Sequence, residues 1–381
     1  MRILQYIPQK EATTGYGAQY LSLLNHALSK VADVEVVSSY KAFKLSIKEQ
    51  RPDIVHIHAC WNIAGYRIQQ LTVKEHLPHL LSLHGGMQPW HLKHHFYLQK
   101  IPLLVLGQHQ AITKAHAIQV DGPMEMRRMK SIHWNERLGQ VDNALITKNL
   151  SADDMANQMI ALYQKVIDSN AFYLMSDDEK LAEQYLLQSG LSSTTTKDAN
   201  CPSLSDASWR RICLHAHDEG ITDIIEKGAS QLQLSPMVDV SEIDRFAPIL
   251  KKNLDALATT QVFTKNPLTK ASFETICSDE NPSDAEKTVC QAFMNLSHEL
   301  KHKTLCRRHL ADLYNILRDT DYDEDKVGRM LKHLKLHAFA ASLLQILHDS
   351  MGLEEGFMPF DPKNNKKTNN IIQSLHNLNI Q

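Results

Sequence analysis

PDIVHIHACWN (52–62) is the stretch of sequence that decides the fold. Within it, Ile54–Ala59 is a short apolar run after Pro52-Asp53, which is typical of a buried strand. LLSLHGG (80–86) has the same form, an apolar run that ends at a histidine and two glycines. Glycine lets a chain leave a strand through a tight turn. Both stretches therefore predict strands that end in loops with polar side chains.

The flanking sequence alternates short apolar runs with helical patterns up to about residue 150. Apolar residues in 18–29 recur every three or four positions, as on one face of a helix. Strands that alternate with helices predict a parallel sheet with helices on both faces. The predicted strands are Arg2–Ile7, Val34–Val37, Ile54–Ala59 and His79–Leu83, with weaker candidates at Leu103–Leu106 and Ala117–Val120.

Beyond residue 150 the pattern becomes helical. Ser151-Ala-Asp-Asp154 is a capping-box signature, and an apolar stripe follows it. We expect this helix, 151–168, to pack on the sheet domain because its stripe needs a partner. Almost no strand is expected after residue 175. Further helices are predicted at 177–189, 206–232, 241–258, 284–302, 304–318 and 323–350, with a last short one in the polar tail after Asp361.

The predicted fold class is α/β: a Rossmann-like parallel-sheet domain over residues 1–170, followed by an all-α region over 171–381. Hydrophobic residues make up 43% of the chain and charged residues 22%, which excludes a disordered or fibrous protein. The net charge of -2 argues against binding nucleic acid by charge alone. The six scattered cysteines indicate no disulfide framework, and the longest apolar runs are too short to span a membrane. We expect a soluble, cytoplasmic protein.

Three motifs occur in order within the first domain: Gly15-Tyr16-Gly17 as a loop after the first strand, PDIVHIH (52–58), and the strand that ends in His84-Gly85. This ordered trio resembles the N-terminal domain of GT-B glycosyltransferases of family 4. The segment 143–166 is similar to the helix that ends members of that family. The resemblance implies a retaining sugar transfer from an activated donor, in polysaccharide or glycoconjugate biosynthesis of bacterial type.

The resemblance also assigns roles to residues. Two glycines let a backbone approach a diphosphate, although a tight turn without a ligand would use the same residues. Aromatic faces beside polar side chains suit a sugar ring, although ordinary loop packing would look alike. The catalytic candidate is His84; the donor or phosphate-binding candidates are Gly15, Tyr16, Gly17 and Gly85; the acceptor-binding candidates are His58, Trp61, Asn62, Gln88, Trp90 and Lys93. We expect these residues to converge at the carboxyl edge of the sheet.

One part of the family pattern is missing. No glutamate is followed by another glutamate eight positions later, so the donor-binding Glu-x7-Glu motif is absent, and helices replace the second Rossmann domain. Arg210 and Arg211 are weak substitutes for the family's basic pair. Two hypotheses stay open. The first is a glycosyltransferase-like enzyme; the second is a non-catalytic binding or regulatory protein built on a degenerate glycosyltransferase domain.

Metal, cofactor and partner expectations follow from the same residues. His56, His58 and Cys60 share one face of a strand, but no fourth zinc ligand is evident. Residues 319–330 imitate a calcium loop but lack its glycine and its final glutamate. We therefore expect no metal and no cofactor, with a nucleotide sugar as co-substrate. The expected partners are that donor, a glycan or lipid-linked acceptor, and a protein bound by the helical region; no nucleic acid and no membrane span are expected.

Overall fold

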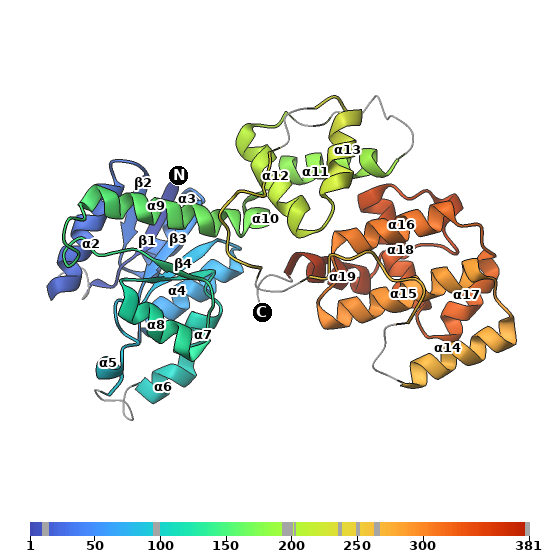
Figure 1. Ribbon diagram of the computed structural model, residues 1–381, viewed down its shortest axis with the longest axis horizontal. Helices are drawn as coiled ribbons and strands as arrows, with labels where there is room; N and C mark the ends of the chain where they lie inside the picture. The colour runs from blue at the N-terminus through green and yellow to red at the C-terminus, as the bar shows by residue number, and fades with distance from the viewer. Residues whose placement is uncertain are drawn as a thin grey trace. The chain divides into compact units, whose positions relative to one another are not determined.

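The computed structural model describes residues 1–9, 15–93, 100–192, 201, 203–234, 238–248, 252–262 and 267–377. The chain forms two compact units (Figure 1). The first comprises Met1–Leu174 together with Ile243–Ala247, and the second comprises Met175–Glu242 and Pro248–Gln381. We call them the sheet unit and the helical unit.

Six strands form the sheet of the first unit, and every neighbouring pair is parallel. Their order across the sheet is β2-β1-β3-β4-β5-β6. The predicted parallel sheet and the α/β fold class are therefore confirmed. The strands are β1 (Arg2–Tyr6), β2 (Asp33–Val37), β3 (Ile54–His58), β4 (His79–Ser82), β5 (Ala117–Val120) and β6 (Leu138–Gln140).

Helices cover both faces of this sheet because successive strand residues point to opposite sides. Ile3 packs with α2 (Gly15–Leu28) and α9 (Ala152–Asp168) on one face. Its neighbour Leu4 packs on the other face, against the helices α3 (Tyr40–Glu49), α4 (Ile63–Lys74), α7 (His109–Thr113) and α8 (Pro123–Ile132). Each connection between parallel strands thus carries a helix back across the sheet.

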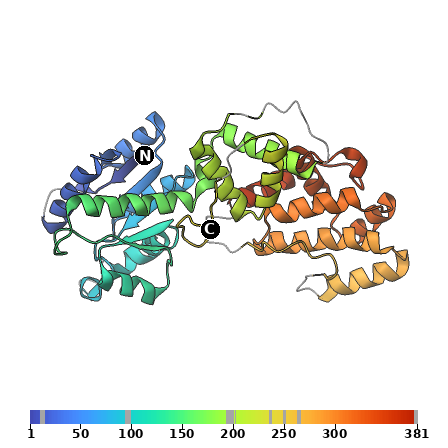
Figure 2. The same ribbon diagram turned by 45° about the horizontal axis from the view of Figure 1, so that its top comes forward.

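The helix predicted at 151–168 is α9, and it packs on the sheet unit as expected. Both views show it lying along the sheet (Figure 2). Ser151 caps it and forms the predicted box with Asp154. The apolar stripe joins the core on the α2 face, through Met155, Met159, Leu162 and Val166.

Two predictions inside the sheet unit need correction. Leu103–Leu106 is not a strand: it falls in the helical turns α6 (Ile101–Leu103) and η2 (Leu104–Gln108). Val105 is 78% exposed there, so this apolar run has no sheet neighbours to pair with. Strand β6 is not predicted from the sequence, because Leu138 and Gly139 are only half-buried and Gln140 is exposed at the edge of the sheet.

Helices α5 (Pro89–Lys93) and α10 (Ala171–Leu174) complete the sheet unit. The helical unit has no strand among its described residues, as predicted. Its elements are α11 (Asp177–Leu191), α12 (Asp206–Asp218), α13 (Thr222–Gln231), α14 (Pro267–Glu280), α15 (Asp284–His302), α16 (Arg307–Asp319), α17 (Glu324–His333), α18 (His337–Met351), η3 (Glu355–Phe357) and α19 (Lys366–Asn377).

Two long predicted helices are each divided in two. The stretch 206–232 breaks at Gly220, whose φ of 69° is left-handed and ends a helix readily. The stretch 323–350 breaks at Lys335, which also has a positive φ. A periodic apolar pattern alone does not reveal such a break, since the apolar stripe continues on both sides.

The helix predicted at 241–258 is wrong. The described residues of this stretch, 241–248 and 252–258, are irregular, and Pro248 removes a helix hydrogen bond. Their polar groups bond elsewhere within each unit. Asp244 pairs with Lys165 at 2.7 Å in the sheet unit, and the Asn253 N–H donates to the Thr304 carbonyl in the helical unit.

Candidate functional site

The strand order points to one edge of the sheet as a ligand site. The chain leaves β1 toward β2 on one side and leaves β3 toward β4 on the other. In an open doubly wound sheet, ligands bind outside the carboxyl ends of the strands where the order reverses. His58 is the last residue of β3, and His84 follows the neighbouring strand β4. These two predicted residues are brought together at this edge.

His84 bonds through both ring nitrogens. Its Nδ1 lies 3.1 Å from Asp121 Oδ2, and its Nε2 lies 3.0 Å from Nδ1 of His58. The His58 and His84 rings are nearly parallel, with an interplanar angle of 7°. His84 is 23% exposed, whereas His58 is fully buried. A ligand at this edge can therefore reach His84 but not His58.

The turn after β4 explains why His84 stands at the edge. His84 and Gly85 have φ values of 46° and 74°, both left-handed. This conformation is rare outside glycine, and it turns the chain sharply away from the sheet. A Cβ on Gly86 would lie 2.5 Å from Cys60 Sγ, so a glycine is needed for the close approach.

A buried chain of hydrogen bonds continues inward from His84. Asp121 accepts from Gln119 at 2.8 Å, and Gln119 in turn accepts from the Ser82 hydroxyl. Ser82 contacts Nε2 of His56 at 2.6 Å, and Nδ1 of His56 contacts the Tyr163 hydroxyl at 2.7 Å. The chain thus joins β3, β4, β5 and α9 beneath the exposed histidine. We call it the His84 chain.

Burial and neighbouring groups determine which side chains of the His84 chain are charged. It lowers the pKa of His56 and of His58 well below the usual value, and the positive potential of neighbouring histidines lowers them further. Burial raises the pKa of Asp121, but the His84 charge and hydrogen bonds from His84 and Gln119 outweigh it and hold the pKa below its usual value. At neutral pH the chain therefore combines one carboxylate with neutral inner histidines.

With Asp121 ionised, the Nδ1–H of His84 donates to the carboxylate. A neutral His84 then accepts at Nε2 from the Nδ1–H of His58. A protonated His84 instead donates from both nitrogens. The arrangement can hold a positive charge at the edge of the sheet and balance it with the Asp121 carboxylate.

The predicted glycine loop is a helix N-terminus. Gly15, Tyr16 and Gly17 form the first turn of α2, where we had predicted a loop. The side chain of Tyr16 lies outside the described residues, as do residues 10–14. Tyr20, one turn further, contacts the His84 ring edge-on at 5.6 Å, so the start of α2 lies beside His84. The first N–H groups of a helix have no partner within it and attract anions.

The N–H of Gly85, one of the donor or phosphate-binding candidates, has a partner within the protein. It donates to Glu125 Oε1 at 2.8 Å. The other oxygen of Glu125 accepts the N–H of Asp121 at 3.0 Å. Glu125 therefore ties together the loops that follow β4 and β5, and the Gly85 N–H has a structural role.

The acceptor-binding candidates separate into two groups. Trp61 lies near the edge, but its indole N–H donates to the Gly86 carbonyl, and Asn62 caps α4 through Oδ1. Trp90 is 69% exposed and Lys93 is exposed, both on the short helix α5. Gln88, half-buried, precedes α5. Gln88 lies close to the turn after β4, since its Cγ is 3.8 Å from the position that a Cβ on Gly85 would occupy.

Sequence reasoning missed several residues of the site. Asp121 directly follows the weak strand candidate 117–120, and its position after a strand was the signal that could have identified it. Glu125 and Tyr163 gave none, because their partners are distant in sequence. Lys100, only 7% exposed, places its Nζ 5.9 Å from the centre of the Trp61 ring. It adds a cation near the end of β3.

Within the described residues, no three His, Cys, Asp or Glu side chains are grouped as metal ligands. His56 and His58 bond within the protein instead. No described helix combines the length and the apolar character that crossing a bilayer requires.

No protein-family model, no curated protein and no solved structure matches this chain.

Proposed function

We propose that the sheet unit binds a nucleotide sugar at its carboxyl edge and that the chain is a glycosyltransferase-like protein of the GT-B type. One observation carries this proposal: a partly exposed His84–Asp121 pair stands at the carboxyl edge of the sheet, where His84 contacts His58 at the end of β3 and the Tyr20 ring of α2. A cationic side chain and free helix N–H groups both suit a diphosphate.

The proposed reaction is a transfer with retention. The bond between the donor sugar and its diphosphate breaks, and the acceptor hydroxyl oxygen bonds to the same face of the sugar carbon, while its proton passes to the departing diphosphate. The diphosphate leaves with an added negative charge, so stabilising this charge lowers the barrier most. Protonated His84, paired with Asp121, would supply positive charge at that place, and the first turn of α2 would hold the phosphates.

The helical unit has to supply the remaining donor contacts, alone or with a partner protein. Its described residues contain no strand and therefore no second parallel sheet. Arg211, proposed as part of a basic pair, is already bound by Glu179 at 2.5 Å. The sheet unit would thus act mainly on the acceptor and phosphate side.

A second function is favoured by a separate observation. Both ring nitrogens of His84 and the N–H of Gly85 have partners within the protein. A site whose hydrogen-bonding groups already have partners within the protein favours ligand binding over catalytic turnover. In this case the chain binds a sugar or nucleotide and regulates a partner through its helical unit.

Thermal melting with ligands separates these functions. We expect UDP, GDP or a corresponding nucleotide sugar to raise the melting temperature, since a ligand at about 100 times its Kd stabilises by about 2.7 kcal/mol. His84→Ala should weaken that effect, whereas His26→Ala, an exposed histidine of α2, should not. Sugar transfer that is lost in His84→Ala supports the enzyme. Binding without transfer to any acceptor supports the regulator, and the absence of binding by every nucleotide and nucleotide sugar contradicts both.

A further inference from the structure

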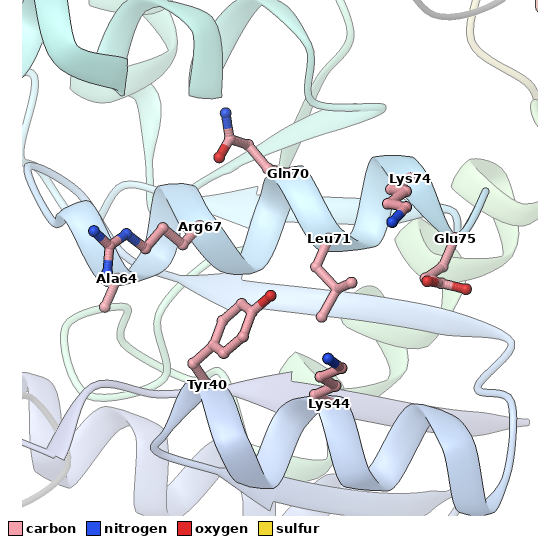
Figure 3. Close-up of a pocket in the computed structure, with 8 residues that line it drawn as sticks. All are labelled: Tyr40, Lys44, Ala64, Arg67, Gln70, Leu71, Lys74 and Glu75. Carbon is pink, nitrogen blue, oxygen red and sulfur yellow. The ribbon is translucent and has the colours of Figure 1, made fainter.

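A groove between α3 and α4 lies on the outer side of these two helices and shares no residue with the His84 chain (Figure 3). Its volume is about 580 Å³, within the usual range for small-molecule sites. Because α3 and α4 follow β2 and β3, the groove starts near the carboxyl edge of the sheet at Tyr40 and ends near the amino edge at Lys74.

The floor of the groove is apolar and aromatic. Figure 3 shows the Tyr40 ring and the Leu71 side chain extending from the two helices toward one another. Phe43 and Ile68 on the same helices are buried against the sheet, so the helices are held in place from below. The carbon skeleton of a ligand could therefore rest on a surface that is already formed.

Three cations surround this floor: Lys44, Arg67 and Lys74. Among the described residues, none of the three makes an ion pair or a side-chain hydrogen bond, and Glu75 is the one acidic residue of the lining. Arg2, by contrast, is held by Glu35 at 2.7 Å. The groove thus has an excess of two positive charges that the protein itself does not neutralise.

The cations are spaced along the groove. Figure 3 places Arg67 toward one end and Lys74 with Glu75 toward the other, and Lys44 lies opposite Leu71 on the neighbouring helix. Arg67 and Lys74 are seven positions apart on α4, which corresponds to roughly 10 Å along a helix axis. Two lysines provide point charges for one phosphate group, and a guanidinium binds oxygens in a bidentate way. This arrangement matches an elongated ligand with an anionic group at each end.

We propose that the groove binds a phosphorylated small molecule. One phosphate lies between Lys44 and Lys74, the carbon part covers Leu71 and Tyr40, and a second anionic or polar group reaches Arg67. The site is separate from the proposed nucleotide-sugar site. A free phosphate ester and a phospholipid headgroup share the required chemistry, and the experiment below distinguishes them.

Calorimetric titration at low ionic strength tests this site, with inorganic pyrophosphate, fructose bisphosphate, and phosphatidylcholine vesicles with or without phosphatidic acid as probes. Lys44→Ala/Lys74→Ala should weaken binding on the order of tenfold to a hundredfold, as expected for lost charge-assisted hydrogen bonds. Lys114→Ala/Lys130→Ala removes the same charge from two exposed lysines elsewhere in the sheet unit and should leave the affinity within about twofold. Lys44→Arg/Lys74→Arg should retain binding.

Each outcome of the titration either supports the groove as a phosphate site or overturns it. Binding of the soluble phosphates that depends on Lys44 and Lys74 supports a free ester, and the same dependence seen only with phosphatidic acid vesicles supports a lipid headgroup. Equal weakening by the Lys114/Lys130 control overturns the site, because binding then follows net charge. Failure of every probe to bind the wild type overturns it as well. Loss of binding in His84→Ala would move the ligand to the carboxyl edge, which overturns the groove but leaves the proposed function intact.

Discussion

A histidine lies at the centre of a polar network in each unit, and the two networks carry opposite charge patterns. In the sheet unit, burial lowers the pKa of His56 and of His58, and neighbouring histidines lower it further. In the helical unit, His215 lies between two buried carboxylates, 2.6 Å from Glu183 and 3.6 Å from Glu219. Burial lowers the pKa of His215, but these carboxylates outweigh it and raise the pKa above its usual value.

The helical network is fully ionic. Arg307 donates to Glu183 at 2.6 Å, and the Lys252 ammonium pairs with Glu219. Burial raises the pKa of both glutamates, but their cationic partners outweigh it and lower the pKa below its usual value. These partners are Arg307 and His215 at Glu183, and Lys252 and His215 at Glu219. The comparison shows that burial alone does not determine whether a histidine is charged. The nearest buried partner does, so the same residue type serves as a neutral relay in one unit and as a cation in the other.

Breaking the ionic network should have the largest effect on the free energy of unfolding. Glu183→Ala leaves His215 and Arg307 without their shared carboxylate in a buried place, which should cost about 3–5 kcal/mol of unfolding free energy. Hydrogen exchange read by mass spectrometry should show the loss in peptides of α11 and α12. Asp177→Ala removes an exposed carboxylate from the same helix and should change stability by less than about 1 kcal/mol. Equal losses in the two variants would show that the network contributes nothing specific.

Breaking the His84 chain should lower the free energy of unfolding by a smaller amount, because the outer end of the chain is partly exposed. Asp121→Asn keeps the size of the side chain but removes the charge that His84 faces at 3.1 Å. We expect a loss of about 1–3 kcal/mol, confined to peptides of β3, β4 and β5. Protection unchanged in β4 would mean that Asp121 does not hold the His84 turn.

Within one pH unit the pH dependence of stability is the smallest effect, and its sign differs between the units. A histidine with a lowered pKa favours unfolding once pH falls below the usual value, because the unfolded chain then binds more protons. His56, His58 and His79, whose burial lowers its pKa to about 4, should each cost on the order of 1 kcal/mol per pH unit between pH 6.5 and the folded pKa. The sheet unit should therefore lose protection as pH falls from 6.5 toward 4.

His215 has the opposite sign. Its raised pKa means that its contribution is fully present below pH 6.5 and is lost as pH rises through the folded value. The helical unit should therefore lose protection on the alkaline side, and His215→Gln should remove that dependence. Parallel pH profiles for peptides of the two units would contradict both assignments.

Much of the sheet could be predicted because its evidence is local. Ile54–His58 and His79–Ser82 are short, fully buried runs whose apolar residues are bounded by turn residues, and a parallel sheet follows from their alternation with helices. β6 could not be predicted, because Leu138–Gln140 pairs through its backbone and is little buried. The irregular path of 241–248 depends on partners such as Lys165, which lies 79 positions from Asp244.

The candidate site was predicted in part for the same reason. His58 and His84 each end a strand, so topology alone brought them together. Asp121, which orients His84, was not recognised because the strand before it was weak. The helical network did leave a signal: Glu179 and Glu183 on α11 are spaced like Arg211 and His215 on α12, and each pair joins residues 32 positions apart. Such a ladder of matched charges is readable only once the two helices are known to be neighbours.

The most direct test of the contrast between the units is a pH titration of the histidine ring nitrogens by NMR, with signals assigned from His58→Gln and His215→Gln. The structure predicts that His58 stays neutral when pH falls well below 6.5, and that His215 stays doubly protonated when pH rises above 6.5. Titration of both rings together near pH 6.5 would show that neither network controls its histidine, and it would remove the electrostatic basis of the proposed site at His84.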